Sequence, residues 1–216
     1  MVAFEKLSRI EVNYDILLEK KIPHGAGLGG GSGNAAGTLQ ALNYIFRNST
    51  GSEGLIPQES IYEIALELGA DVPFFLKPVP SEIRGRGEQI RDLKNYPKFY
   101  VVIIKPYFAI PTLEAYKKCI PKRKTKFPVI SSFYELNSQM NNQFESSLLV
   151  QYPLLSKLKT LLLENGAFGA LVSGSGSAVF GVYNKKNKQN QAYKDLKCLH
   201  VGEIFSCETL VNHRYF

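Results

Sequence analysis

A glycine-rich stretch near the start of the chain is the first feature that could do chemistry. Five of the seven residues in the range 25–31 are glycine, and an alanine- and leucine-rich segment follows. Glycine lets a ligand approach the backbone closely and tolerates positive φ. Where such a loop opens a helix, its free N–H groups and the helix dipole favour an anion, most often phosphate. The hydroxyl of Ser32 adds a group suited to a phosphate oxygen or to Mg²⁺.

Other interpretations of this loop fit less well. No Gly-Lys-Ser/Thr sequence closes it, as a P-loop would require. Residues 25–30 match G-x-G-x-x-G, but a dinucleotide site needs a second strand that ends in an acidic residue, and a second helix is expected there instead. A flexible linker is not normally framed by an apolar strand and an amphipathic helix. The sequence therefore favours a phosphate-binding loop.

Hydrophobic spacing predicts the elements that position the loop. Residues 14–22 are expected to form a strand that enters it, and apolar residues at helical spacing predict a helix over about 33–46. Pro57 suits the first turn of a second helix and Gly69 its end. We expect "ADVPFFL" (70–76) to start a separate segment, because Pro73 prevents simple continuation of a helix.

The second half of the chain alternates strands and helices. The run "FYVVIIK" (99–105) predicts a buried strand, and strands at 168–172 and 178–183 flank the short loop "SGSGS". Further helices are expected at 112–119, 141–150, 153–166 and about 187–196, with a last strand at about 201–208. This order predicts an α+β protein with two lobes, residues 1–95 and 96–216.

Composition excludes several classes of protein. The 216 residues are 44% hydrophobic and 21% charged, without a run of apolar residues long enough for a membrane span and without a signal peptide at the start. Three widely spaced cysteines suggest neither a disulfide framework nor a zinc site, so we expect a cytoplasmic protein. The net charge of +7, much of it at 117–126 and 185–188, suits an anionic partner or simply a solvated surface. No nucleic-acid-binding motif accompanies these lysines.

Several motifs together resemble the GHMP kinases, small-molecule kinases named after galactokinase, homoserine kinase, mevalonate kinase and phosphomevalonate kinase. Their phosphate loop, P-x-x-x-G-L-G-S-S-A, is similar to "PHGAGLGGGSGNAA" at 23–36, and its G-L-G-G-G-S form indicates one subfamily. "LGADVPFFL" (68–76) resembles the catalytic aspartate motif, and "GRGEQI" (85–90) the turn that follows it. "LVSGSGSAVFGVY" (171–183) resembles the family's third motif, and "AIPTLEAYKK" (109–118) a segment at the cytidine end of the substrate.

The resemblance implies a fold and a reaction. The fold would combine an incomplete N-terminal lobe that is ribosomal-S5-domain-2-like with a C-terminal ferredoxin-like α/β sandwich. The expected cofactors are ATP and Mg²⁺, and the expected substrate is a diphosphocytidyl sugar alcohol, in a monomer or homodimer without nucleic-acid or membrane partners. Rival interpretations are a kinase of another subfamily, a nucleotide-binding protein without turnover and, more remotely, a basic nucleic-acid-binding module.

The resemblance also assigns residues. Asp71 would be the general base that contacts the substrate hydroxyl, and its alternative is an ordinary Asx cap or turn residue. Thr112, Tyr116 and Lys117 are candidates for the cytidine end, and their alternative is a plain helix turn with Thr112 as N-cap. No residue is assigned as a metal ligand. The residues expected to bind ATP are Pro23, His24, Gly25, Ala26, Gly27, Leu28, Gly29, Gly30, Gly31, Ser32 and Gly33 of the first loop, and Ser173, Gly174, Ser175 and Gly176 of the second.

Two departures from the family pattern affect these expectations. Gly33 occupies a place where the family often has a second serine. The Lys-x-Asn-Leu and Gly-Tyr-His motifs that precede the family's phosphate loop are not found before residue 23. We therefore expect the natural protein to extend further at its N-terminus, and the alternative is a shortened form with weak or no activity.

Overall fold

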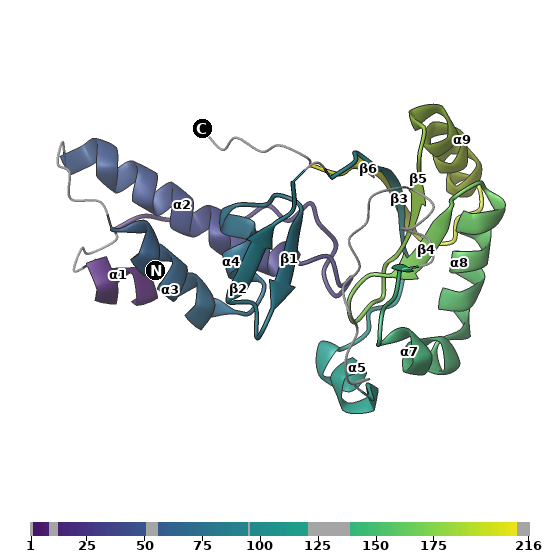
Figure 1. Cartoon of the computed structure of the whole chain (residues 1–216), viewed down its shortest axis with the longest axis horizontal. Coiled ribbons are helices and arrows are strands. Elements are labelled where there is room, and N and C mark those ends of the chain that lie inside the picture. Colours follow the sequence, from purple (N-terminus) through teal and green to yellow (C-terminus); the bar gives the residue numbers. More distant parts are fainter. Residues whose placement is uncertain (1, 9–12, 51–55, 95, 121–138, 211–216) are drawn as a thin grey trace. The chain divides into compact units, whose positions relative to one another are not determined.

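The computed structural model describes residues 2–8, 13–50, 56–94, 96–120 and 139–210. The chain divides into two compact units (Figure 1). Unit 1 comprises Met1–Lys21, Gly29–Lys94 and Asn212–Phe216, and unit 2 comprises Ile22–Leu28 and Asn95–Val211. The assignment of residues 1–95 and 96–216 as two domains stays a prediction.

Helices form the core of unit 1. They are α1 (Val2–Ser8), α2 (Gly30–Thr50), α3 (Gln58–Leu68) and α4 (Val72–Leu76). The apolar positions of α2 and α3 recur at helical spacing, so each helix buries one face against the other. Pro57 and Gly69 occupy the two ends of α3, as predicted. Helix α2 begins and ends further out than the predicted 33–46.

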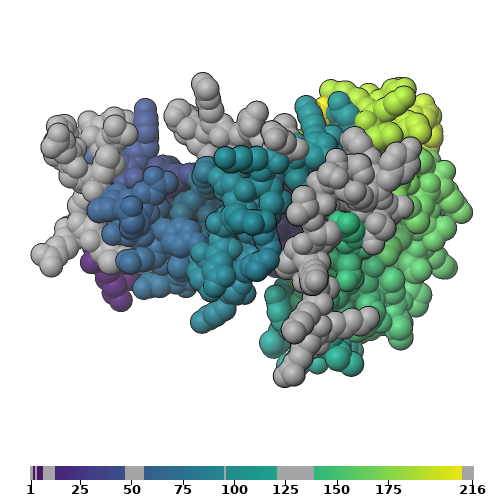
Figure 2. All heavy atoms as spheres, in the orientation of Figure 1, coloured from purple at the N-terminus to yellow at the C-terminus, as the bar shows by residue number. Residues whose placement is uncertain are grey.

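A hairpin of two short strands completes the described part of unit 1. Strands β1 (Ser81–Arg84) and β2 (Gln89–Asp92) pair antiparallel, with Ile83 opposite Ile90. The sequence analysis predicted only the turn between them. Figure 2 shows the atoms of this hairpin, in teal, on the surface turned toward the viewer.

The strand predicted for residues 14–22 is wrong. In the described part of the chain these residues have no regular secondary structure and pair with neither β1 nor β2. A strand is stable only when a neighbouring strand satisfies its N–H and C=O groups, and hydrophobic spacing cannot show whether that neighbour is there. The apolar side chains are accordingly exposed, and Leu17 reaches 98%.

Unit 2 contains a four-stranded antiparallel sheet in the order β4-β5-β3-β6. Its strands are β3 (Tyr100–Lys105), β4 (Gly169–Val172), β5 (Val179–Tyr183) and β6 (Glu203–Glu208), and its helices are α5 (Thr112–Lys118), α7 (Glu145–Gln151), α8 (Pro153–Glu164) and α9 (Lys186–Lys197). Helices α8 and α9 cover one face of the sheet (Figure 1). The resulting β-α-β-β-α-β order is ferredoxin-like and confirms the predicted α+β fold class.

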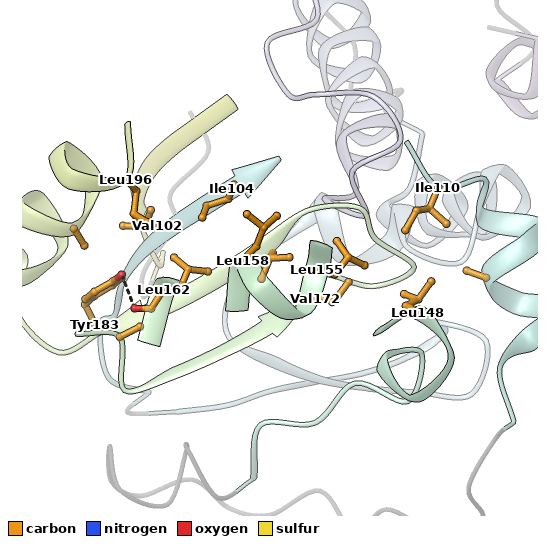
Figure 3. Close-up of a cluster of buried hydrophobic side chains, with 14 residues drawn as sticks. Val102, Ile104, Ile110, Leu148, Leu155, Leu158, Leu162, Val172, Tyr183 and Leu196 are labelled. Atoms are coloured by element: carbon orange, nitrogen blue, oxygen red, sulfur yellow. Dashed lines mark hydrogen bonds between the residues drawn. The ribbon is translucent and has the colours of Figure 1, made fainter. Parts of the chain in front are cut away.

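The core of unit 2 lies between this sheet and its helices (Figure 3). Leu155, Leu158 and Leu162 share one face of α8 and are fully buried. The hydroxyl of Tyr183 lies 3.5 Å from the carbonyl oxygen of Leu162, and burial raises the pKa of this phenol. In the described residues, no helix is both long and apolar enough to span a membrane.

Candidate functional site

In unit 2, the first half of the glycine-rich loop packs against the loop between β4 and β5. The hydroxyl of Ser173 donates to the carbonyl oxygen of Gly27 over 2.8 Å. The N–H of Ser177 donates to the carbonyl oxygen of Gly25 over 3.2 Å. Two predicted phosphate-loop segments, distant in sequence, are therefore joined by hydrogen bonds within one unit.

Close backbone approach explains why glycine occurs in this half of the loop. Gly27 has a φ of +71°, and a Cβ there would lie 2.0 Å from the carbonyl oxygen of Ser173. Gly25 has a φ of +63°, and a Cβ there would lie 2.9 Å from Cβ of Ala109. A side chain at Gly27 would push the two loops apart, and one at Gly25 would push the first loop away from Ala109. Pro23 is half-buried, whereas His24 is exposed.

Three residues that the sequence analysis missed hold the second loop. Asn142 donates from Nδ2 to the carbonyl oxygens of Val172 and Gly174, each over 2.8 Å. Glu145 accepts the N–H of Val172 at Oε1 over 2.7 Å and pairs with Lys159 at Oε2 over 2.6 Å. The only sequence signal was a polar segment just before a helix, which is typical of ordinary caps.

The three candidates for the cytidine end all lie on α5. Pro111 is at the N-cap position, so Thr112 is not the cap, and its hydroxyl lies 3.5 Å from that of Ser175. The ring of Tyr116 packs edge-on against Phe144 with centroids 4.9 Å apart, and 63% of this tyrosine is exposed. Lys117 is exposed in the last turn. Residues 121–126 of the basic cluster lie outside the described residues.

In unit 1, the second half of the glycine-rich loop becomes the first turn of α2. The N–H groups of Gly30, Gly31 and Ser32 belong to this first turn, where a helix offers no acceptor, while the N–H of Gly33 donates to the carbonyl oxygen of Gly29 over 2.9 Å. A Cβ at Gly31 would meet no atom within 4 Å, so the space beside the turn is open. This helix terminus fits an anion such as phosphate.

Asp71 lies at the start of α4, a helix that is fixed to α2. A Cβ at Gly29 would lie 2.8 Å from the ring of Phe75, and Gln40 of α2 donates to the carbonyl oxygen of Leu76 over 2.7 Å. Asp71 is at the N-cap position, but its side chain makes no capping hydrogen bond and is exposed. The carboxylate is therefore available for another role.

The turn between β1 and β2 lies against Ala70, the residue just before the candidate base Asp71. A Cβ at Gly87, which has a φ of +120°, would lie 1.9 Å from the carbonyl oxygen of Ala70. The hydroxyl of Tyr62 donates to the carbonyl oxygen of Glu88 over 2.5 Å. The N–H groups of Glu88 and Arg86 hold the pKa of the Glu88 carboxyl below its ordinary value. The turn is thus held by Tyr62 of α3 and by the hydrogen bond between its own residues Arg86 and Glu88.

A Mg²⁺ ion that binds with a nucleotide needs fewer protein ligands than a structural metal ion does. Of the described residues, no three among His, Cys, Asp and Glu come together as a metal site. When Mg²⁺ binds with a nucleotide, phosphates and water supply most of its ligands, beside one or two protein oxygens. The hydroxyl of Ser32, in the first turn of α2, is an oxygen ligand of the kind that fits.

Comparison of the sequence with known families identifies the class of protein to which this fold and these loops belong. The family description "GHMP kinases N terminal domain" matches residues 1–77, and "GHMP kinases C terminal" matches residues 128–201. The chain belongs to the GHMP kinases, as the motifs predicted.

Individual relatives indicate which subfamily of the GHMP kinases this chain is most similar to among those compared. A protein of Geobacter sp. (strain M21) is 36% identical over 200 residues, which cover 90% of this chain and 69% of the relative. A protein of Thermodesulfovibrio yellowstonii is 35% identical over 205 residues, covering 89% and 70%. Both are named 4-diphosphocytidyl-2-C-methyl-D-erythritol kinase. A crystal structure of 4-(cytidine 5'-diphospho)-2C-methyl-D-erythritol kinase matches with a TM-score of 0.74 at 30% identity, over 88% of this chain and 68% of that one.

Proposed function

We propose that this chain transfers the γ-phosphoryl group of ATP to the 2-hydroxyl of 4-diphosphocytidyl-2-C-methyl-D-erythritol, a step in non-mevalonate isoprenoid precursor biosynthesis. The observation that carries the proposal lies in unit 1. There the ring of Phe75 lies against Gly29, just before the N-terminus of α2, and Gln40 in the middle of α2 holds Leu76, so the short helix that follows Asp71 is fixed to α2. The substrate is inferred from the names of the relatives.

In this proposal Asp71 takes the proton of the substrate hydroxyl. The hydroxyl oxygen forms a bond to the γ-phosphorus of ATP, the bond from that phosphorus to the β,γ-bridging oxygen breaks, and ADP leaves. A carboxylate suits the role because it accepts a proton at neutral pH when it is within hydrogen-bond reach. The absence of a capping bond at Asp71 supports the assignment.

Backbone N–H groups would do most of the remaining work. In unit 1, the first turn of α2 offers donors to the phosphate oxygens, and preorganised donors of this kind stabilise the charge that spreads over a transferring phosphoryl group. Mg²⁺, when bound with ATP, neutralises part of the same charge. Ser32, in the first turn of α2, carries a hydroxyl suited to either partner.

The cytidine end of the substrate is assigned to α5. The exposed ring of Tyr116, supported by Phe144, offers an aromatic face for the cytosine. Lys117 carries a positive charge suited to the diphosphate. These assignments rest on the family resemblance and on the exposure of both side chains.

A panel of acceptors tests the proposal. The purified chain is incubated with ATP and Mg²⁺, together with the diphosphocytidyl substrate, homoserine or mevalonate, and ADP release is followed. We expect release that requires the diphosphocytidyl substrate. ADP release with another acceptor would point to another GHMP subfamily, and ATP binding without release would point to a protein that binds nucleotide without turnover.

A further inference from the structure

We propose that Asn142 is a positioning residue that aims the N–H of Ser175 at a phosphate of the bound nucleotide. This inference rests on the proposed function, because it requires ATP as the ligand. Asn142 reaches the second loop through backbone carbonyls, among them that of Gly174, the residue before Ser175. The direction of the Ser175 N–H is therefore set through the backbone.

The side-chain amide of Asn142 is fully engaged. Its Nδ2 donates to the carbonyl oxygens of Val172 and Gly174, each over 2.8 Å. Its Oδ1 accepts the N–H of Phe144 over 3.1 Å. The oxygen of the amide is therefore identified by a donor and the nitrogen by two acceptors, which fixes the orientation of the group.

The bond to Gly174 determines the direction of the next N–H. A trans peptide unit is planar, and its C=O and N–H point in opposite directions. Because the carbonyl of Gly174 points at Asn142, the N–H of Ser175 points away from Asn142. The peptide unit two steps earlier shows the same effect, since its carbonyl at Val172 is also bound by Asn142 and its N–H at Ser173 donates to the carbonyl oxygen of Ala178 over 2.8 Å.

The N–H of Ser175 has no acceptor within the described part of the chain, whereas the next N–H, at Gly176, donates to the carbonyl oxygen of Ser173 over 2.9 Å. Ser175 is only 8% exposed. Buried N–H groups are almost always paired, so one that is aimed and unpaired indicates a ligand. Its position in the predicted phosphate loop favours a phosphate oxygen.

The base of the loop is held separately. Glu145 accepts the N–H of Val172 and pairs with Lys159, and both charged side chains are largely buried. Without the Asn142 side chain, Glu145 would still hold the end of β4, whereas the peptide unit between Gly174 and Ser175 would lose the bond that sets its direction. If that unit rotates, its carbonyl oxygen replaces the N–H and repels an anion.

Nucleotide binding by Asn142→Ala tests the inference, with Asn141→Ala as the matched control because Asn141 is the exposed neighbour. The dissociation constant for MgATP is measured by calorimetry on the whole chain. We expect Asn142→Ala to bind about tenfold more weakly or worse, since hydrogen bonds to charged groups are among the stronger ones, and Asn141→Ala to bind as the wild type does. Circular dichroism checks folding, and Asn142→Ser replaces the alanine variant if that variant does not fold.

A spectroscopic measurement separates positioning from general damage. The ¹⁵N–¹H resonance of Ser175 is expected to shift when MgATP is added to the wild type and to lose that response in a folded Asn142 variant. Unchanged affinity in the folded variant, or an unchanged response at Ser175, would overturn the inference alone. Failure of the wild-type chain to bind MgATP would instead refute the proposed function, and the inference with it.

Discussion

The hydroxyl of Ser173 and the carbonyl oxygen of Gly27 are joined by a 2.8 Å hydrogen bond, although 146 positions separate the two residues. Unit 2 thus contains both the second loop and the first half of the glycine-rich loop. A substitution that breaks the contact in one loop should therefore also destabilise the other loop.

Substitution of Ser173 tests this connection. Ser173→Ala removes the donor to Gly27 and should lower the free energy of unfolding by about 1 kcal/mol, the usual net contribution of one hydrogen bond. Urea denaturation measures the change. Ser156→Ala, at an exposed position of α8, is the control and should change it by less than about 0.5 kcal/mol. Equal stability of the two variants would show that the bond does not hold the loops.

Gly27 should be the least tolerant glycine of the loop. Gly27→Ala places a Cβ 2.0 Å from the carbonyl oxygen of Ser173 and forces alanine to a φ of +71°, so the free energy of unfolding should fall by about 2 kcal/mol or more. Gly37→Ala is the matched control, because Gly37 lies inside α2 with open space around it, and it should gain about 0.5–1 kcal/mol. Denaturant titration of both variants compares them. A loss at Gly37 as large as that at Gly27 would contradict the steric argument.

Gly87 should affect the turnover number rather than nucleotide affinity. A Cβ at Gly87 would displace the carbonyl of Ala70 and with it the neighbouring Asp71, and an error of about 1 Å in a catalytic group costs up to roughly 100-fold in rate. Steady-state kinetics of Gly87→Ala should show a lower kcat with a similar KM for ATP. Gly166→Ala, also at positive φ but without a neighbour within 4 Å, should keep its kcat. Parallel losses in both variants would mean that the turn has no special relation to Asp71.

Glu88 should make the turn sensitive to acid. Backbone N–H groups lower the pKa of its carboxyl in the folded chain below the ordinary value of 4.5, so its contribution to stability is present above that value and is lost as the pH falls through the lowered pKa. The difference in free energy of unfolding between wild type and Glu88→Gln should be constant above about pH 5 and shrink below it. Urea titrations at a series of pH values measure it, with Glu67→Gln, on the exposed face of α3, as the control for a lost charge. A difference that grows toward low pH would contradict the prediction.

Local pattern was enough to predict most of the elements. The run at 99–105 became β3, the spacing of Leu155, Leu158 and Leu162 became one buried face of α8, and the second loop lies between β4 and β5 as expected. These elements depend on periodicity and on turn residues, both of which are local properties. The strand predicted at 14–22 failed because its pairing depends on a neighbour that periodicity cannot identify.

The residues that position the candidate site could not be predicted in the same way. Asn142, Gln40 and Tyr62 act through hydrogen bonds to carbonyl oxygens 26 to 36 residues away, and nothing in their local sequence indicates those partners. Asp71 was recognised only through the family motif, since by itself it resembles a capping residue. Long-range polar contacts become visible only when the fold brings the segments together.

The most direct test of the account is substrate-dependent ADP release by the wild-type chain beside Asp71→Asn, a variant of nearly the same size that cannot act as the base. The wild type should release ADP only when 4-diphosphocytidyl-2-C-methyl-D-erythritol is present. Asp71→Asn should bind MgATP with unchanged affinity but turn over at least about 100-fold more slowly, in the range that general base catalysis supplies. Release by Asp71→Asn at the wild-type rate, or a wild-type rate that does not depend on the substrate, would contradict the assignment of Asp71 and the proposed reaction.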